Sequence, residues 1–197
     1  MMACLSLLGM VFSVLLFGFS PADPDPGLAP DSLSVPSPDP QAADSTSLRV
    51  PPAGDYLLVS KSQHLLRHFR DGTLVATYNV ALGKNPADKS REGDMATPLG
   101  SFVISGIKDS SYWTHDFGDG KGEIKGAYGP FFIGIKTSAE NTRSGKAWTG
   151  IGIHGTHDPA SIGTDASEGC IRMHNSDLLL LKAALKDLAQ VPIDIVQ

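Results

Sequence analysis

The stretch DYLLVSKSQHLLRHFRDGTLVATYNVAL, residues 55–82, decides the fold class of this chain. Two apolar runs, 55–60 and 63–70, are followed by Asp71-Gly72, a dipeptide that favours a tight β-hairpin turn because both residues tolerate positive φ. A third run, 73–82, is expected to place on one face Leu74, Ala76, Tyr78 and Val80. The stretch therefore predicts three short strands, the last two joined as a hairpin.

The remaining sequence up to Gln197 predicts more strands and one helix. Strands are expected at 101–107, 131–136, 150–153 and 191–196, the last at a sheet edge because Pro192 has no backbone N–H. A helix is expected over 176–189, opened by Asn175 or Ser176 as N-cap. Its buried stripe would consist of Leu178, Leu181, Leu185 and Leu188. The predicted fold class is mostly β, with one helix in the C-terminal region.

The folded domain is expected to span residues 53–197, preceded by two segments of different composition. Residues 1–20 are almost wholly apolar and uncharged, which is typical of a signal peptide or a short membrane anchor. Residues 21–52 hold nine of the fourteen prolines, and such a segment buries too little apolar surface to become ordered. It is expected to be a disordered tether. Export to the cell envelope follows from this organisation, with the chain periplasmic or extracytoplasmic, secreted or anchored at a membrane through residues 1–20.

The charges are unevenly distributed along the chain. Five aspartates and one arginine fall in residues 21–52, whereas the expected domain has nearly balanced charges. The sequence contains no basic cluster, so a nucleic-acid partner is not expected.

Cys170 is the only cysteine outside the expected leader, which contains Cys4. A lone thiol in an exported domain has no partner for an internal disulfide. His154 lies sixteen positions earlier, and an imidazole beside a thiol can take its proton to give a thiolate–imidazolium pair. Gly169 leaves space beside the sulfur, and the N–H groups around it are candidate oxyanion donors. From the residues alone, a catalytic pair and a buried structural thiol both remain open.

A metal site is the competing interpretation of this region. Its candidate ligands are His154, His157, Asp158, Cys170 and His174. No two of them have a chelating spacing on a helix or a Cys-x-x-Cys arrangement, so neither a metal nor another cofactor is expected. The isolated histidines, expected at the surface of strands or loops, are His64, His68 and His115.

Residues 110–130 are rich in glycine and contain few strand signals. A loop of this length inside a compact domain is more often functional than idle. It is expected to form a wall or lid over a cleft, or else a surface excursion packed by Trp113, Phe117 and Tyr128.

Three motifs resemble the catalytic domain of L,D-transpeptidases (YkuD type). His154-Gly155-Thr156 is followed, after a loop, by Ser167-Glu168-Gly169-Cys170-Ile171-Arg172-Met173, which is similar to the family's Ser-x-Gly-Cys-Ile-Arg-Met. Thr97-Pro98-Leu99-Gly100-Ser101-Phe102 is similar to Thr-Pro-x-Gly-x-Phe. The resemblance covers roughly residues 55–196 and implies a β-sandwich-like fold.

The resemblance also implies a two-step acyl transfer on peptidoglycan stem peptides. Cys170 would attack the carbonyl of the third residue of a donor peptide and release the terminal D-amino acid. His154 would accept the thiol proton, and the backbone carbonyl of Gly155 would orient its imidazole. An amine acceptor would then resolve the thioester, by 3→3 cross-linking or by attachment to a protein.

The neighbours of the cysteine have two interpretations each. Arg172 either binds a substrate carboxylate or forms a buried ion pair. Ser167, expected with Gly169 on the substrate side, either bonds substrate or holds the turn. Glu168 departs from the family, many members of which have histidine there; it either contacts an acceptor ammonium or faces solvent. Two other functions are kept open, a carboxypeptidase or hydrolase that uses water as acceptor, and a non-catalytic wall-binding module.

Overall fold

The computed structural model describes residues 53–118, 120–185 and 190–197. The expected leader and tether, residues 1–52, lie outside them. In the described part, the main sheet consists of β1 (Asp55–Ser60), β2 (Leu65–Arg70), β3 (Thr73–Gly83), β4 (Gly100–Asp109), β7 (Phe131–Lys136), β8 (Gly152–His154), β9 (Asp165–Ser167), β10 (Ile171–Met173) and β11 (Pro192–Val196). A separate hairpin consists of β5 (Thr114–Asp116) and β6 (Glu123–Lys125), and the helices are the 3-10 turn η1 (Pro159–Ser161) and α1 (Asn175–Ala184). The mostly-β fold class with one α-helix is confirmed.

The β2–β3 hairpin has the predicted turn. Arg70 pairs with Thr73, and the two residues between them, Asp71 and Gly72, have φ of 49° and 77°. Positive φ at both positions is the conformation whose twist matches that of antiparallel strands.

The predicted face of β3 is correct at Tyr78 and Val80 but wrong at Leu74. His68 pairs with Ala76 and the next residue, Phe69, pairs with Leu74, so Val75 is an extra residue in the ladder. An inserted residue interrupts the alternation of side chains between the two faces of a strand. Tyr78 and Val80 are buried, whereas Leu74 is 50% exposed.

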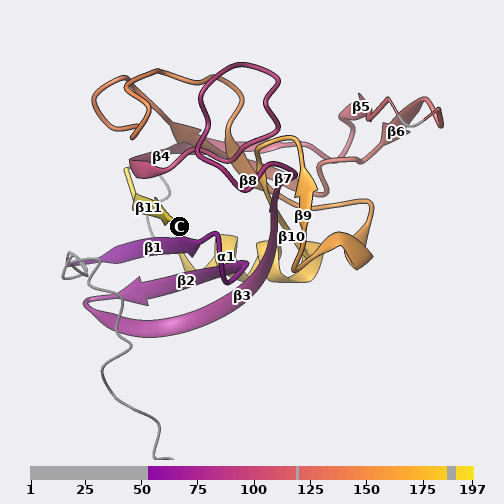
Figure 1. The fold of residues 1–197 in the computed structure, drawn as a ribbon. Coiled ribbons are helices and arrows are strands. Elements are labelled where there is room, and N and C mark those ends of the chain that lie inside the picture. Colours follow the sequence, from indigo (N-terminus) through magenta and orange to yellow (C-terminus); the bar gives the residue numbers. More distant parts are fainter. Residues whose placement is uncertain (1–52, 119, 186–189) are drawn as a thin grey trace, which may run out of the picture. The chain divides into compact units, whose positions relative to one another are not determined.

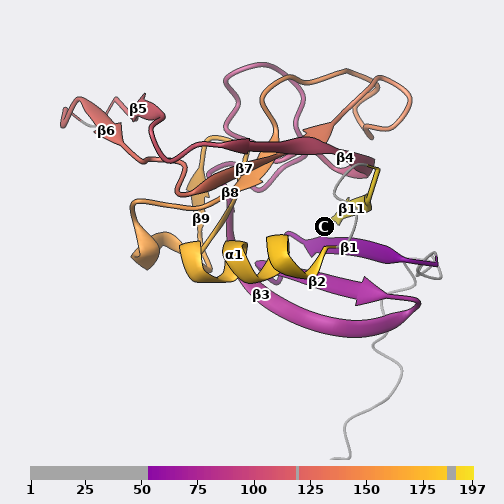
Figure 2. The ribbon, with the colours of Figure 1, turned by 180° about the vertical axis from the view of Figure 1, so that it is seen from behind.

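The pairings of the main sheet close on themselves. The order is β10-β8-β7-β4-β11-β1-β2-β3-β9, and β10 also pairs with β3. Figures 1 and 2 show β1, β2 and β3 in one layer and β4, β7 and β8 in the other, with α1 beside them. The sandwich-like arrangement implied by the resemblance is therefore present.

The C-terminal strand is central, which corrects the expectation of an edge. β11 lies between β4 and β1 in the sheet. Pro192 is its first residue, and its pairing with β1 begins one residue later, at Ile193. A proline at the first position of a strand is tolerated in a sheet interior because it interrupts no later part of the ladder.

Helix α1 is shorter than predicted. Its buried leucines are Leu178 and Leu181; Leu185, which is also buried as expected, caps the helix, and Leu188 lies outside the described residues. The helix ends at Ala184, whose carbonyl accepts a hydrogen bond from Arg70 Nη2, and Leu185 has extended backbone angles. A cation at the last helical carbonyls stabilises such an end. No helix within the described residues is long and apolar enough to span a membrane.

Candidate active site

The parallel pairing of β8 with β10 brings the two motifs together. Ile171 lies opposite Ile153, and Arg172 lies opposite His154. Since successive side chains of a strand point to opposite faces, the buried isoleucines define the core face. His154, Arg172 and Cys170, which directly precedes β10, therefore share the other face.

This face borders a cavity of about 510 Å³. Four segments of the sequence contribute its walls. The lining includes Lys89, Glu92 and Met95 from the 84–99 segment; His115, Phe117 and Tyr128 from the 110–130 segment; Trp148 to Ile151; and His154, Glu168, Cys170 and Arg172. The 110–130 segment thus forms a wall, one of its two predicted roles, and it contains the β5–β6 hairpin.

The His154 imidazole is fixed on both sides. Its Nδ1 lies 2.7 Å from the carbonyl oxygen of Gly155. Because a carbonyl only accepts, Nδ1 carries the hydrogen and the lone pair is left to Nε2. The ring stacks on Phe132 at 5.8 Å and contacts the ring of Tyr128 at 4.8 Å. Burial lowers the pKa of His154 to about 3, although the Gly155 hydrogen bond opposes this shift.

Cys170 is half-buried, and its Sγ donates to the carbonyl oxygen of Gly150 at 3.2 Å. Burial raises the pKa of its thiol to about 11, against the opposing effects of the Gly152 backbone and the Arg172 charge. With the imidazole pKa at about 3, the site favours a neutral thiol and a neutral imidazole in the free protein. Burial opposes the expected thiolate–imidazolium pair in the free protein, because it penalises both charges.

The turn before Cys170 is held internally. Ser167 is fully buried; its hydroxyl donates to Cys170 O at 2.5 Å and accepts from Gly169 N at 3.1 Å. These bonds fit the second interpretation of Ser167, that it holds the turn. They also engage the Gly169 N–H, which is therefore not a free oxyanion donor. Gly169 has φ of 127°, and a Cβ there would lie 2.8 Å from Ala96 O, so both its backbone conformation and its neighbour require glycine.

Helix α1 supports the residue that orients the imidazole. Asn175 was expected as a possible N-cap, but the N-cap is His174, without a side-chain capping bond. Asn175 Oδ1 instead accepts a hydrogen bond from Thr156 N at 2.9 Å. A Cβ on Gly155 would lie 2.1 Å from this oxygen and 2.9 Å from Gly129 Cα. Gly155 is thus packed against α1 and the 110–130 segment at the position where its carbonyl meets His154.

Arg172 is buried and has no ion pair within the described residues. Its Nε has no hydrogen-bond partner there, and its guanidinium lies 5.0 Å from the centre of the Phe117 ring. A buried ion pair is therefore not its role in the described part of the chain. An unpartnered guanidinium at a cavity is suited to an anionic ligand group.

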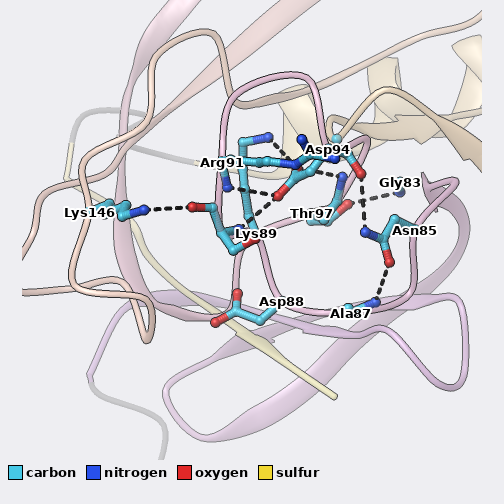
Figure 3. Close-up of polar contacts among 12 residues, drawn as sticks. Gly83, Asn85, Ala87, Asp88, Lys89, Arg91, Asp94, Thr97 and Lys146 are labelled. Atoms are coloured by element: carbon cyan, nitrogen blue, oxygen red, sulfur yellow. Dashed lines mark hydrogen bonds and ion pairs between the residues drawn. The ribbon is translucent and has the colours of Figure 1, made fainter.

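The 84–99 segment is organised around one buried carboxylate (Figure 3). Asp94 accepts from Lys89 Nζ at 2.8 Å and from the backbone N–H groups of Ser90, Arg91 and Ala96. Burial works against its ionisation, but these hydrogen bonds hold the pKa of Asp94 well below its ordinary range. Lys89 in turn lies 5.1 Å from the centre of the Trp148 ring. At the start of the Thr97–Phe102 motif, Thr97 Oγ1 accepts from Gly83 N at 2.9 Å, which joins the segment to β3.

Of the three isolated histidines, His68 is not at the surface as expected, and the other two are partly exposed but contact carboxylates. His68 is fully buried and contacts Asp55 at 2.9 Å, while His64 contacts Asp165 at the same distance. His115 lines the cavity and contacts Glu168. The contact of His115 with Glu168 could not be predicted from the sequence because the two residues are 53 positions apart; the only signal was the length of the 110–130 segment.

Among the described residues, no group of three His, Cys, Asp or Glu side chains is placed to hold a metal ion.

The sequence model of the L,D-transpeptidase catalytic domain (YkuD) matches residues 54–193. This match covers more than half of the chain, and the chain belongs to this family. YkuD of Bacillus licheniformis is 30% identical over 137 residues, which are 70% of this chain and 64% of that protein. YqjB of Bacillus subtilis is 30% identical over 130 residues, 66% of this chain and 65% of that protein. Both carry the name L,D-transpeptidase, and the chain spans just under two thirds of the length of each.

Solved structures share the fold. An L,D-transpeptidase from Mycobacterium smegmatis gives a TM-score of 0.54 at 14% identity, covering 74% of this chain and 59% of that one. An Enterococcus faecium L,D-transpeptidase gives 0.52 at 18% identity, covering 72% and 49%. At these identities the likeness concerns the fold alone.

Proposed function

We propose that this chain is a peptidoglycan L,D-transpeptidase in which Cys170 carries the acyl group and His154 moves the proton. The observation that supports this most is the 2.7 Å contact between His154 Nδ1 and Gly155 O, on the strand face that also holds Cys170. It leaves the lone pair on Nε2, as a general base for a thiol requires. Membership of the L,D-transpeptidase family supports the reaction class.

In the first step, the Cys170 sulfur attacks the carbonyl of the third residue of a donor stem peptide while its proton passes to His154 Nε2. His154 then gives this proton to the leaving amine, and the terminal D-amino acid departs. Because burial favours both groups in their neutral forms, proton transfer is expected to accompany the attack. Arg172, whose Nε has no hydrogen-bond partner among the described residues, suits a carboxylate of the donor.

In the second step, an amine acceptor attacks the thioester, either from another stem peptide or from a protein. Its attack restores the Cys170 thiol and forms an amide. Water in place of the amine would make the chain a carboxypeptidase. We infer that the reaction takes place in the cell envelope. Residues 1–20 would direct export of the chain or anchor it in a membrane, and residues 21–52 would tether the catalytic domain.

Incubation of the protein with a purified tetrapeptide muropeptide tests this function, with the products identified by mass spectrometry. A dimer joined 3→3 is expected. Tripeptide alone would identify a hydrolase. Cys170→Ala is expected to abolish turnover, and His154→Ala to lower it by several orders of magnitude. Turnover by a folded Cys170→Ala variant would refute the mechanism.

Acylation by a carbapenem provides a second test that needs no acceptor. A covalent adduct is expected on the wild type and not on Cys170→Ala. A folded wild-type protein that forms no adduct and releases no D-amino acid would be a non-catalytic module.

A further inference from the structure

Three polar side chains outside the Cys170–His154 pair form a hydrogen-bonded chain along the cavity wall. Glu168 Oε2 lies 3.0 Å from His115 Nε2, and His115 Nδ1 lies 3.2 Å from Tyr128 Oη. The chain begins two residues before the nucleophile and ends at the tyrosine whose ring contacts His154 at 4.8 Å. It therefore runs beside both reacting groups.

The chemistry of Glu168 and His115 determines which of the two donates the hydrogen bond. An ionised carboxylate only accepts, so His115 Nε2–H is the donor. Phe117 packs edge-on against His115 at 4.5 Å, and Tyr128 does so at 5.7 Å. Two aromatic rings and two hydrogen-bonding partners thus limit the rotation of the imidazole. Glu168 is aimed by a rigid neighbour rather than left free in solvent.

Glu168 retains capacity for a ligand. Within the described residues it forms one hydrogen bond, through Oε2, so Oε1 has no partner there. The side chains of Glu168 and His115 are 35% and 28% exposed, and both line the cavity. A ligand in the cavity can therefore reach the carboxylate.

The position of this negative charge does not assist the first chemical step. A carboxylate beside a thiol makes the thiolate less favourable, and Glu168 acts in this direction on the pKa of Cys170. The Glu168 carboxylate would also disfavour the negative charge that develops on the donor carbonyl oxygen during the attack. A cationic second substrate, by contrast, is attracted to this position.

We propose that the Glu168 carboxylate, held by His115, is the subsite that binds the ammonium group of the amine acceptor. The proposal rests on the transpeptidase function above and names the residues that favour an amine over water. The acceptor binds as an ammonium and gives one proton to solvent, and the neutral amine attacks the thioester. The C–N bond forms, the C–S bond breaks, and the second amine proton passes through His154 to the Cys170 sulfur.

The test measures how the acyl-enzyme is partitioned. The full chain is incubated with the tetrapeptide muropeptide, and the ratio of 3→3 dimer to tripeptide is determined together with the rate of D-amino acid release. Glu168→Gln is expected to lower the ratio about tenfold without lowering the release rate, because the carboxylate does not assist acylation. Glu168→Asp keeps the charge and is expected to recover part of the ratio. His115→Phe removes the donor that aims Glu168 and is expected to lower the ratio as well.

Hydroxylamine as an alternative acceptor distinguishes loss of ammonium binding from a general loss of thioester reactivity, because it is an uncharged nucleophile at neutral pH. The yield of hydroxamate is expected to be unchanged in Glu168→Gln. Glu140→Gln, which removes an exposed carboxylate that does not line the cavity, is the matched control and is expected to leave the dimer ratio unchanged. Thermal melting establishes that each variant is folded.

Two results would overturn the proposal. One is an unchanged dimer ratio in Glu168→Gln. The other is an equal loss of dimer and hydroxamate, which would show that Glu168 only supports the structure around Cys170. Failure of the underlying transpeptidase function has a different signature: the wild type itself makes tripeptide without dimer, or releases no D-amino acid at all.

Discussion

Asn175 Oδ1 accepts the backbone N–H of Thr156 at 2.9 Å, which ties the first turn of α1 to the residue after Gly155. The only α-helix among the described residues therefore supports the imidazole indirectly, through the carbonyl that His154 contacts. This makes Asn175 a positioning residue, which contacts no reacting atom.

Asn175→Ala is expected to lower the rate of D-amino acid release by about tenfold or more, because Gly155 loses its support. It would also leave a buried N–H unpaired, at a cost of roughly 1–3 kcal/mol in the free energy of unfolding. Initial rates and urea titrations measure the two effects. Ser176→Ala, on the exposed neighbouring residue, is the control and should change neither. A normal rate in a folded Asn175→Ala variant would show that Gly155 needs no such support.

Gly155→Ala is expected to abolish activity and to destabilise the fold by several kcal/mol. The new methyl group would overlap Asn175 Oδ1 and the backbone of Gly129, and backbone cannot move aside cheaply. Gly118→Ala is the comparison, since a Cβ there meets no atom within 4 Å and only the positive φ of 67° is unfavourable. Its cost should be about 1 kcal/mol. Melting temperatures of the two variants give the measurement, and similar losses would contradict the predicted overlap.

The buried state of His154 predicts how stability depends on pH. Its folded pKa of about 3 lies below the ordinary value of 6.5, so the unfolded chain binds a proton first as the pH falls. The contribution of His154 is fully present above pH 6.5 and is progressively lost toward the folded pKa. Urea unfolding at pH 7 and at pH 5 should show a drop that is smaller in His154→Asn. An identical drop in the variant would argue against a depressed pKa.

The same pKa predicts that His154 remains a competent base in mildly acidic solution. Between pH 7 and pH 5, protonation of His154 is not expected to reduce the acylation rate. Carbapenem acylation, followed by intact mass, measures this without an acceptor. A rate that falls with an apparent pKa near 6.5 would contradict the expectation.

Asp94→Asn is expected to lower the free energy of unfolding by roughly 2–4 kcal/mol. The Asp94 side chain is only 5% exposed, and its carboxylate neutralises the charge of Lys89 and accepts hydrogen bonds from three backbone N–H groups. The depressed pKa of Asp94 means that its contribution is present above the ordinary carboxyl pKa and is lost as the pH falls through the folded value. Donor binding should weaken as well, since the 84–99 wall is loosened. Glu140→Gln, at an exposed position, should have little effect. Chemical denaturation and donor KM are the measurements.

Sequence reasoning succeeded where the signal is local. The Asp71-Gly72 turn and the leucines of α1 follow from backbone preference and periodicity, and both are present. The extra residue Val75 could not be foreseen, because a register shift depends on the partner strand. The carbonyl at the end of α1 accepts a hydrogen bond from Arg70, a residue distant in sequence that local periodicity could not indicate.

The candidate site shows the same division. The residues of the two motifs were recognisable, and the structure gathers His154, Cys170 and Arg172 on one strand face. The role of Asn175 and the contact of His115 with Glu168 arise only from folding, since each joins separate segments. Nor could spacing reveal that burial opposes the charged forms of both the thiol and the imidazole.

The double pairing of β10 has a consequence for the order in which the protein assembles. This three-residue strand, which directly follows Cys170, contacts β8 on one side and the much earlier β3 on the other. Contacts between segments so far apart are slow to form, so the ring of strands is expected to close late in folding. The reactive centre would then be completed by the closure itself, and a nascent chain would carry an unactivated thiol until the domain is finished.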